Sequence, residues 1–281
     1  MRFTNLGARV VVGQASLWAT NATVVGGTDC AVVCDPAFTT AEIEAVRAVA
    51  LEAAHDDERI SLFLTHADFD HICGVGLFPG ATVLGARDTE VRLEDGSARA
   101  ELVLSRAEWS EQWPLDIHLD RVVAPGELIR AGTIAVLPVS AHHNGRDGLA
   151  YVFPEERVLV AGDYFSPESY PIVLGRIEPM IEAVHALLRA AAEYDVEHVV
   201  PAHGWVLGRA EAEAIGRDDV DYLERLRDAA SQAVAEGVPH GAALLAVFEV
   251  EPPRAARLDF DVYDVRAGNA RLALADARAA P

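Results

Sequence analysis

The stretch Thr65–His71, THADFDH, places two histidines and two aspartates within six positions, directly after the apolar run Ile60–Leu64. A short apolar run of this kind is typical of a buried strand, so the polar residues are expected at the end of that strand. Imidazole nitrogen and carboxylate oxygen are suitable ligands for zinc or iron. The stretch therefore predicts a metal-binding loop; the alternative is a polar turn that binds nothing.

Three other loops also carry histidine or aspartate after an apolar, β-rich run: Ser140–Gly145, Ala161–Phe165 and Pro201–Gly204. Ligands usually meet an α/β sheet at the carboxyl ends of its strands, so we expect the four loops at one edge. The remaining histidines are expected on the surface or in the core: His55, His118, His143, His185, His198 and His240.

Composition limits the partners of the chain. Its 281 residues include 44 acidic and 23 basic ones, with a net charge of −21. Such a balance disfavours nucleic acid and anionic membranes, because both attract Lys and Arg. Three cysteines, Cys30, Cys34 and Cys73, give no disulfide framework, and no segment is long enough to span a bilayer. We therefore expect a cytoplasmic protein that acts on a small molecule; the oligomeric state is left open.

The order of apolar patterns indicates sheet layers with helices outside them. Strands dominate the first 165 residues, a hairpin is expected at Pro154-Glu155, and helices lead afterwards. Thr39 and Glu42 have the spacing of a capping box at a helix start. The segment Asp88–Leu119 is interpreted as a surface helix with packed aromatics, or as an insertion near a substrate pocket. We predict one domain over residues 1–281, with a helical part from about residue 209.

Together these motifs resemble those of the metallo-β-lactamase-fold hydrolase superfamily, whose signature is His-x-His-x-Asp-His followed by a distant His, an Asp and a final His. The similarity runs from Val10 to about Trp205, and Asp35 matches the family's early strand-end aspartate, which supports the metal loop without being a ligand. The resemblance implies a four-layer αββα sandwich and two divalent metal ions, zinc first, with iron or manganese as alternatives.

The resemblance also implies a ligand set. One metal ion would be held by His66, Asp68 and His142, the second by Asp70, His71 and His203, and Asp163 would bridge the two. His142 is chosen over His143 because it places Gly145 at the usual position of the family's turn. Asp70 would also act in catalysis, by moving a proton toward the leaving group.

Asp68 departs from the pattern, because the family usually has a second histidine there. If Asp68 binds metal, two divalent cations and three carboxylates leave one positive charge, against two for the usual set. That change favours iron or manganese over zinc. If Asp68 is too short to bind, one site would be weak. We favour binding, because a carboxylate beside a cation prefers coordination to desolvated isolation.

The leading hypothesis is a hydrolase of a small ester, thioester, lactone or amide that uses a metal-bound hydroxide. The alternative is an iron-dependent oxidoreductase, either flavodiiron-like or a thiol or persulfide dioxygenase. A phosphodiesterase or nuclease comes third, and a non-catalytic binding module last. Tyr164 is considered as an oxyanion donor, although a core ring is favoured, and Cys73 is interpreted as a buried small residue.

Overall fold

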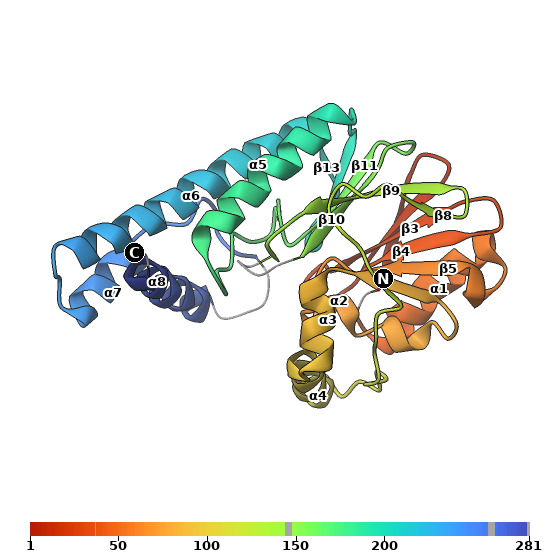
Figure 1. Cartoon of the computed structure of the whole chain (residues 1–281), viewed down its shortest axis with the longest axis horizontal. Coiled ribbons are helices and arrows are strands. Elements are labelled where there is room, and N and C mark those ends of the chain that lie inside the picture. The colour runs from red at the N-terminus through yellow and green to blue at the C-terminus, as the bar shows by residue number, and fades with distance from the viewer. Residues whose placement is uncertain (37, 144–147, 258–261, 280–281) are drawn as a thin grey trace.

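Two β-sheets pack face to face and helices cover both outer faces, which confirms the predicted αββα sandwich (Figure 1). This is a computed structural model, and it describes residues 1–36, 38–143, 148–257 and 262–279. None of the helices in these ranges is long and apolar enough to cross a membrane.

The first sheet comes from the N-terminal half. Within the described ranges it has seven strands in chain order: β1 (Arg2–Leu6), β2 (Val10–Gln14), β3 (Asn21–Gly26), β4 (Ala31–Cys34), β5 (Ile60–Phe63), β6 (Thr82–Gly85) and β7 (Arg121–Val122). Strands β1 to β4 are antiparallel, and β4 to β7 are parallel. The apolar pattern of the sequence does not predict β1, because the residues of this strand are mostly exposed.

The second sheet has six strands in the same described ranges, in the order β13-β12-β11-β10-β9-β8. They are β8 (Ile129–Ala131), β9 (Ile134–Ser140), β10 (Leu149–Phe153), β11 (Val158–Gly162), β12 (His198–Pro201) and β13 (Leu207–Gly208). Strands β10 and β11 form the predicted hairpin, and β11 runs parallel to β12.

The longer helices lie outside the sheets. They are α1 (Thr40–Ala54), α3 (Arg87–Glu94), α4 (Ser97–Glu108), α5 (Ile177–Glu193), α6 (Arg209–Ala235), α7 (His240–Phe248) and α8 (Val262–Ala279). A one-turn helix, α2 (Phe69–Ile72), contains the end of the Thr65–His71 motif, so that Asp70 and His71 lie within this helix. Thr39 and Glu42 form the predicted capping box at the start of α1. In Figure 1, α6, α7 and α8 extend as a helical group away from the sheets.

The alternation of side chains along a strand explains the layers. In β10, Leu149, Tyr151 and Phe153 lie in the core between the two sheets, whereas Ala150 and Val152 pack toward α5. Successive strand residues point to opposite faces, so β10 is apolar at every position because both faces are covered. Cys34 of β4 and Cys30, which directly precedes that strand, lie in the same core between the sheets.

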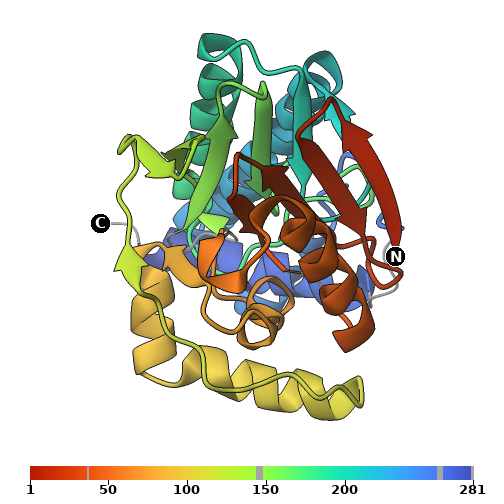
Figure 2. The same cartoon turned by 90° about the vertical axis from the view of Figure 1, so that its right-hand side faces the viewer.

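The segment Asp88–Leu119 is mostly helical, since α3 and α4 occupy its first two thirds (Figure 2). Its two tryptophans pack inward: Trp113 is fully buried, and Trp109 lies edge-on to Trp18 and Phe38. The segment is therefore part of the core on the outer side of the first sheet. α3 also brings Arg92 to the candidate site, which the pattern analysis did not expect.

Candidate metal centre

The candidate ligands come from strand ends of both sheets. In the first sheet β4 leads to Asp35 and β5 leads to the Thr65–His71 loop; in the second, β11 leads to Asp163 and β12 to His203. Side-chain bonds tie the two sheets together here, because Asn21 Nδ2 donates to the carbonyls of Pro201 and Gly204 at 2.8 and 2.7 Å. Loops far apart in the chain therefore meet at one edge of the sandwich.

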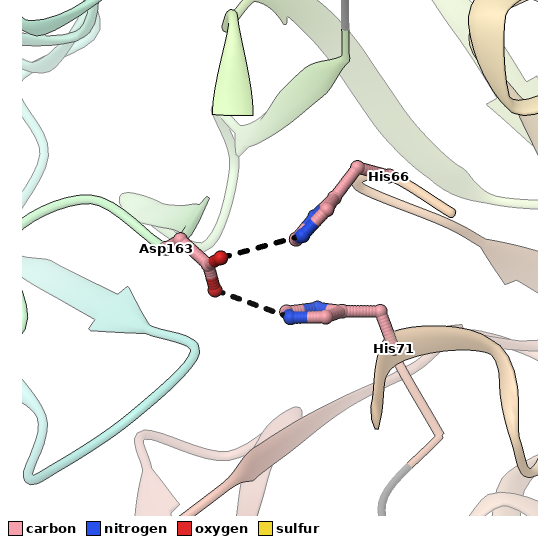
Figure 3. Close-up of side chains that lie close together, drawn as sticks. All are labelled: His66, His71 and Asp163. Carbon is pink, nitrogen blue, oxygen red and sulfur yellow. Dashed lines mark ion pairs between the residues drawn. The ribbon is translucent and has the colours of Figure 1, made fainter. Parts of the chain in front are cut away.

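Asp163 lies at the centre of the cluster, and its two oxygens face different histidines (Figure 3). Oδ2 is 3.3 Å from His66 Nε2, and Oδ1 is 3.1 Å from His71 Nε2. His203 Nε2 lies 3.6 Å from the same Oδ1. Asp163 therefore contacts histidines of both groups of candidate ligands.

Asp70 belongs to the group on the His71 side. Its Oδ2 is 3.3 Å from His203 Nε2 and 3.7 Å from His71 Nε2. Two sets of donor atoms each lie within 4.8 Å of one another: His66, His71 and Asp163 in one, and Asp70, His71 and His203 in the other.

The far nitrogen of each histidine is held by the protein. His71 Nδ1 lies 3.0 Å from Asp35 Oδ2, His203 Nδ1 lies 3.1 Å from the Trp18 carbonyl, and His66 Nδ1 lies 3.0 Å from Thr65 Oγ1. Such contacts fix the ring orientation and leave Nε2 for a metal ion. Contacts of this kind are typical of the residues that orient histidine ligands in a metal centre.

Asp35 has the supporting position that the resemblance implies. Its Oδ1 accepts from Thr65 N–H at 2.8 Å and its Oδ2 accepts from Thr65 Oγ1 at 2.7 Å, besides the contact with His71. Burial opposes ionisation, but the His71 and Thr65 contacts prevail and lower the pKa of Asp35. Breaking a buried charged network of this kind typically costs about 3–5 kcal/mol.

The carboxylates also set the proton affinity of the histidines. Burial and the neighbouring His71 would lower the pKa of His66, but Asp163 and Asp68 outweigh them and raise it to about 9. Burial likewise opposes the shift at His71, yet Asp70, Asp163 and Asp35 raise its pKa well above the usual value. In the metal-free chain the two imidazoles therefore hold protons where a metal ion would otherwise bind.

His142 and His143 are placed differently from the expectation. His142 is not brought to the cluster: it lines a separate pocket with Glu182 and His185 of α5. His143 is buried, and its ring stacks on that of His66 with centroids 4.5 Å apart. The Gly145 turn that favoured His142 lies outside the described residues.

Two glycines make room for the His143 ring. Gly162 has a φ of +62°, and a side chain on it would collide with that ring; a side chain on Gly148 would collide with its Cδ2 atom. Burial first, and then the charge of His66, lower the pKa of His143 to about 3, so its imidazole is neutral, as a metal ligand must be. Strand β9 ends at Ser140, so its alternation of side chains does not extend to the two histidines that follow it.

Asp68 is a member of the cluster, and it has an unexpected partner. Its Oδ2 lies 3.4 Å from His66 Nε2, while its Oδ1 accepts a 2.6 Å bond from Arg92 Nη1. Burial opposes ionisation, but His66 and Arg92 lower the pKa of Asp68 strongly. The carboxylate is therefore charged and held between a histidine and an arginine.

The residues present fit metal ions. His66 Nε2 and His71 Nε2 are buried and face only carboxylate oxygens, at 3.3 and 3.1 Å, and the buried His143 Nδ1 has no hydrogen-bond partner within the described ranges. Buried polar atoms are normally satisfied, so this arrangement fits a cation between the imidazoles and the carboxylates. The donor set, imidazole with carboxylate, suits zinc, iron or manganese.

A cavity of about 250 Å³ opens onto the cluster. Asp68, Asp70, Asp163 and His203 line it on one side, and the other lining residues include Trp18, Tyr170, Ile172, Leu174 and Val265. None of the described lining residues is an arginine or lysine. The cavity is thus a small, mostly apolar chamber beside a polar centre.

Two further residues from the sequence analysis have structural roles. The Tyr164 hydroxyl donates to the His142 carbonyl at 2.6 Å. The hydroxyl that was considered as an oxyanion donor is therefore already engaged in a hydrogen bond. Cys73 is fully buried, and burial raises the pKa of its thiol well above the usual value. It is a core residue, as expected.

Two sheets between helical layers, with histidines and aspartates at the shared sheet edge, define the chain as an αββα protein with a candidate metal centre. A sequence profile of the metallo-β-lactamase superfamily matches residues 15–223, and the chain belongs to that superfamily. The superfamily includes hydrolases, alkylsulfatases among them. No curated protein sequence matches the chain.

Solved structures share the fold at low sequence identity. The inverting sec-alkylsulfatase Pisa1 from Pseudomonas sp. matches 97% of this chain at a TM-score of 0.72 and 12% identity. This chain covers 49% of that enzyme, about half its length. A metallo-β-lactamase family protein from Thermus thermophilus matches 92% of this chain and 86% of its own, with TM-score 0.59 and 19% identity. A metallo-β-lactamase from Hirschia baltica matches 77% of this chain and 96% of its own, with TM-score 0.52 and 19% identity.

Proposed function

We propose that the chain is a dinuclear metal-dependent hydrolase of a small ester, thioester, lactone or amide. The observation that carries this proposal is the placement of Asp163, whose Oδ2 faces His66 and whose Oδ1 faces His71 and His203. A bridging carboxylate between two groups of nitrogen and oxygen donors is suited to two cations close together.

The proposed ligand set differs from the sequence expectation at one position. It comprises His66, Asp68, Asp70, His71, His143, Asp163 and His203, with His143 in place of His142. When bound, the ions polarise the scissile bond and lower the pKa of water, which makes a nucleophile available at neutral pH. Zinc is the first choice of ion.

The chain's own residues do the remaining work. Asp70 lines the cavity and holds its Oδ2 beside His203, so it is placed to accept a proton from the attacking water and return it to the leaving group. Trp18, Ile172 and Leu174 exclude water and hold the apolar part of a substrate. Because no basic side chain lines the described cavity wall, the substrate's non-reacting part is expected to be uncharged.

A substrate panel tests the proposal. Purified, zinc-loaded protein is offered lactones, thioesters, β-lactams and amides, with secondary alkyl sulfate esters added because one structural neighbour is named an alkylsulfatase. We expect turnover of at least one class that a chelator abolishes and zinc restores. Turnover that persists in the chelator would contradict the proposal, as would oxygen consumption with a thiol in place of hydrolysis.

A further inference from the structure

Arg92 is a buried cation next to the candidate metal centre. It lies on α3 with only 8% of its surface exposed. Its Nη1 donates to Asp68 Oδ1 at 2.6 Å, and its Nη2 donates to Glu101 Oε1 of α4 at 2.7 Å. A buried guanidinium needs such partners, because an unpaired buried charge is strongly unfavourable.

The two oxygens of the Asp68 carboxylate contact different neighbours. Oδ1 is engaged by Arg92, and Oδ2 lies on the side of His66 Nε2, 3.4 Å away. A metal ion bound next to His66 would meet one oxygen of Asp68. In that respect Asp68 replaces the single nitrogen of the histidine that the motif usually has there.

The pair also changes the charge of the site. With Asp68 alone, two divalent ions and three ligand carboxylates leave one positive charge, and Arg92, paired directly with Asp68, adds a second beside the centre. Glu101, the other partner of Arg92, has a side chain that is 39% exposed, so water screens its charge more strongly. Counted over the metal ions, their ligands and Arg92, the charge equals that of a site built with a histidine at this position. On this count the carboxylate of Asp68, paired with Arg92, gives no charge-based reason to prefer iron or manganese over zinc.

We propose that Arg92 is a positioning residue of the metal centre, which holds Asp68 as a one-oxygen ligand and compensates its charge, so that Asp68 and Arg92 act together in place of one histidine. The inference rests on the proposed metal centre. It has a consequence that opposes intuition: restoring the family's histidine alone should damage the site, because Arg92 would then face a neutral ring and metal cations without its carboxylate.

A double-mutant cycle with cobalt(II) tests this pair. Cobalt(II) affinity and the visible absorption of bound cobalt are measured for the wild type, Asp68→His, Arg92→Met and the double variant. The absorption weakens as the coordination number rises, so it reports on how Asp68 binds. Arg47→Met is the control, since Arg47 pairs with Asp57 away from the site.

We expect Asp68→His to lower cobalt affinity by about tenfold or more, the usual effect of disturbing a ligand's support. Arg92→Met should weaken the visible absorption, because both oxygens of Asp68 become available. The double variant should recover the wild-type affinity and absorption, and Arg47→Met should match the wild type throughout.

Three results would overturn the inference. They are a wild-type spectrum in folded Arg92→Met, unchanged affinity in Asp68→His, or no recovery in the double variant. If Arg92→Met fails to fold, the cobalt affinity of Asp68→His compared with that of the double variant still tests the inference. Failure of the wild type itself to bind cobalt would instead remove the proposed function, which separates the two claims.

Discussion

Replacing Asp163 with asparagine is expected to reduce hydrolysis on the order of a thousandfold and to lower the zinc content of the protein. Asp163 faces both groups of candidate ligands, so the change removes a charge that both would share. An amide oxygen can still accept a hydrogen bond but cannot neutralise two cations. Both readouts should therefore fall together.

The measurements are the metal content by mass spectrometry and the rate on whichever substrate the panel identifies. Asp228→Asn is the matched control, because Asp228 is an exposed aspartate of α6 that pairs with Arg227. It should keep both the metal and the rate. Wild-type metal content and rate in Asp163→Asn would remove Asp163 from the centre.

The neighbouring histidines provide the second large effect. We expect His143→Ala to lower zinc affinity by at least about tenfold, because it removes a buried neutral imidazole stacked on His66. His142→Ala should change the affinity by less than about twofold, since the structure places His142 in another pocket.

Competition with a chromophoric chelator measures both affinities under the same conditions. The two variants are controls for each other, because they delete the same side chain at adjacent positions. Loss of zinc in His142→Ala with retention in His143→Ala would reinstate the choice made from the sequence. Thermal melts exclude a simple folding defect.

The fold was predictable because its signals are local. Alternating and continuous apolar runs indicate strands covered on one or both faces, and the capping box at Thr39 and Glu42 indicates a helix start. Polar residues directly after strands predicted the positions of His66, His71, Asp163 and His203 at one sheet edge, and the structure brings them together. Helices α7 and α8 lie in the C-terminal part that was expected to be helical, but their stretch carries no motif that indicates a role.

Two features of the site could not be obtained in this way. Which of the adjacent His142 and His143 points toward the cluster depends on the backbone after β9, and no pattern in the sequence predicts it. The space that Gly162 and Gly148 leave for the His143 ring is visible only in three dimensions. Arg92 lies 24 residues from Asp68 in the chain and reaches it through the packing of α3. Such a tertiary partner has no spacing rule that a single sequence could reveal.

The central claim is that these residues hold metal ions. Zinc titration of the metal-stripped chain by calorimetry, at pH 7 in two buffers of different ionisation enthalpy, tests it directly. Zinc binds neutral imidazole, whereas His66, with a pKa of about 9, and His71, with a raised pKa, carry protons at pH 7 in the metal-free chain.

Zinc binding must therefore release protons. The affinity for zinc should rise with pH until the pH exceeds the pKa of His66. We predict saturation at about two zinc ions per chain, with a binding heat that differs between the two buffers. A folded chain that takes up no zinc at pH 7, or at any pH from there to the pKa of His66, would contradict the account.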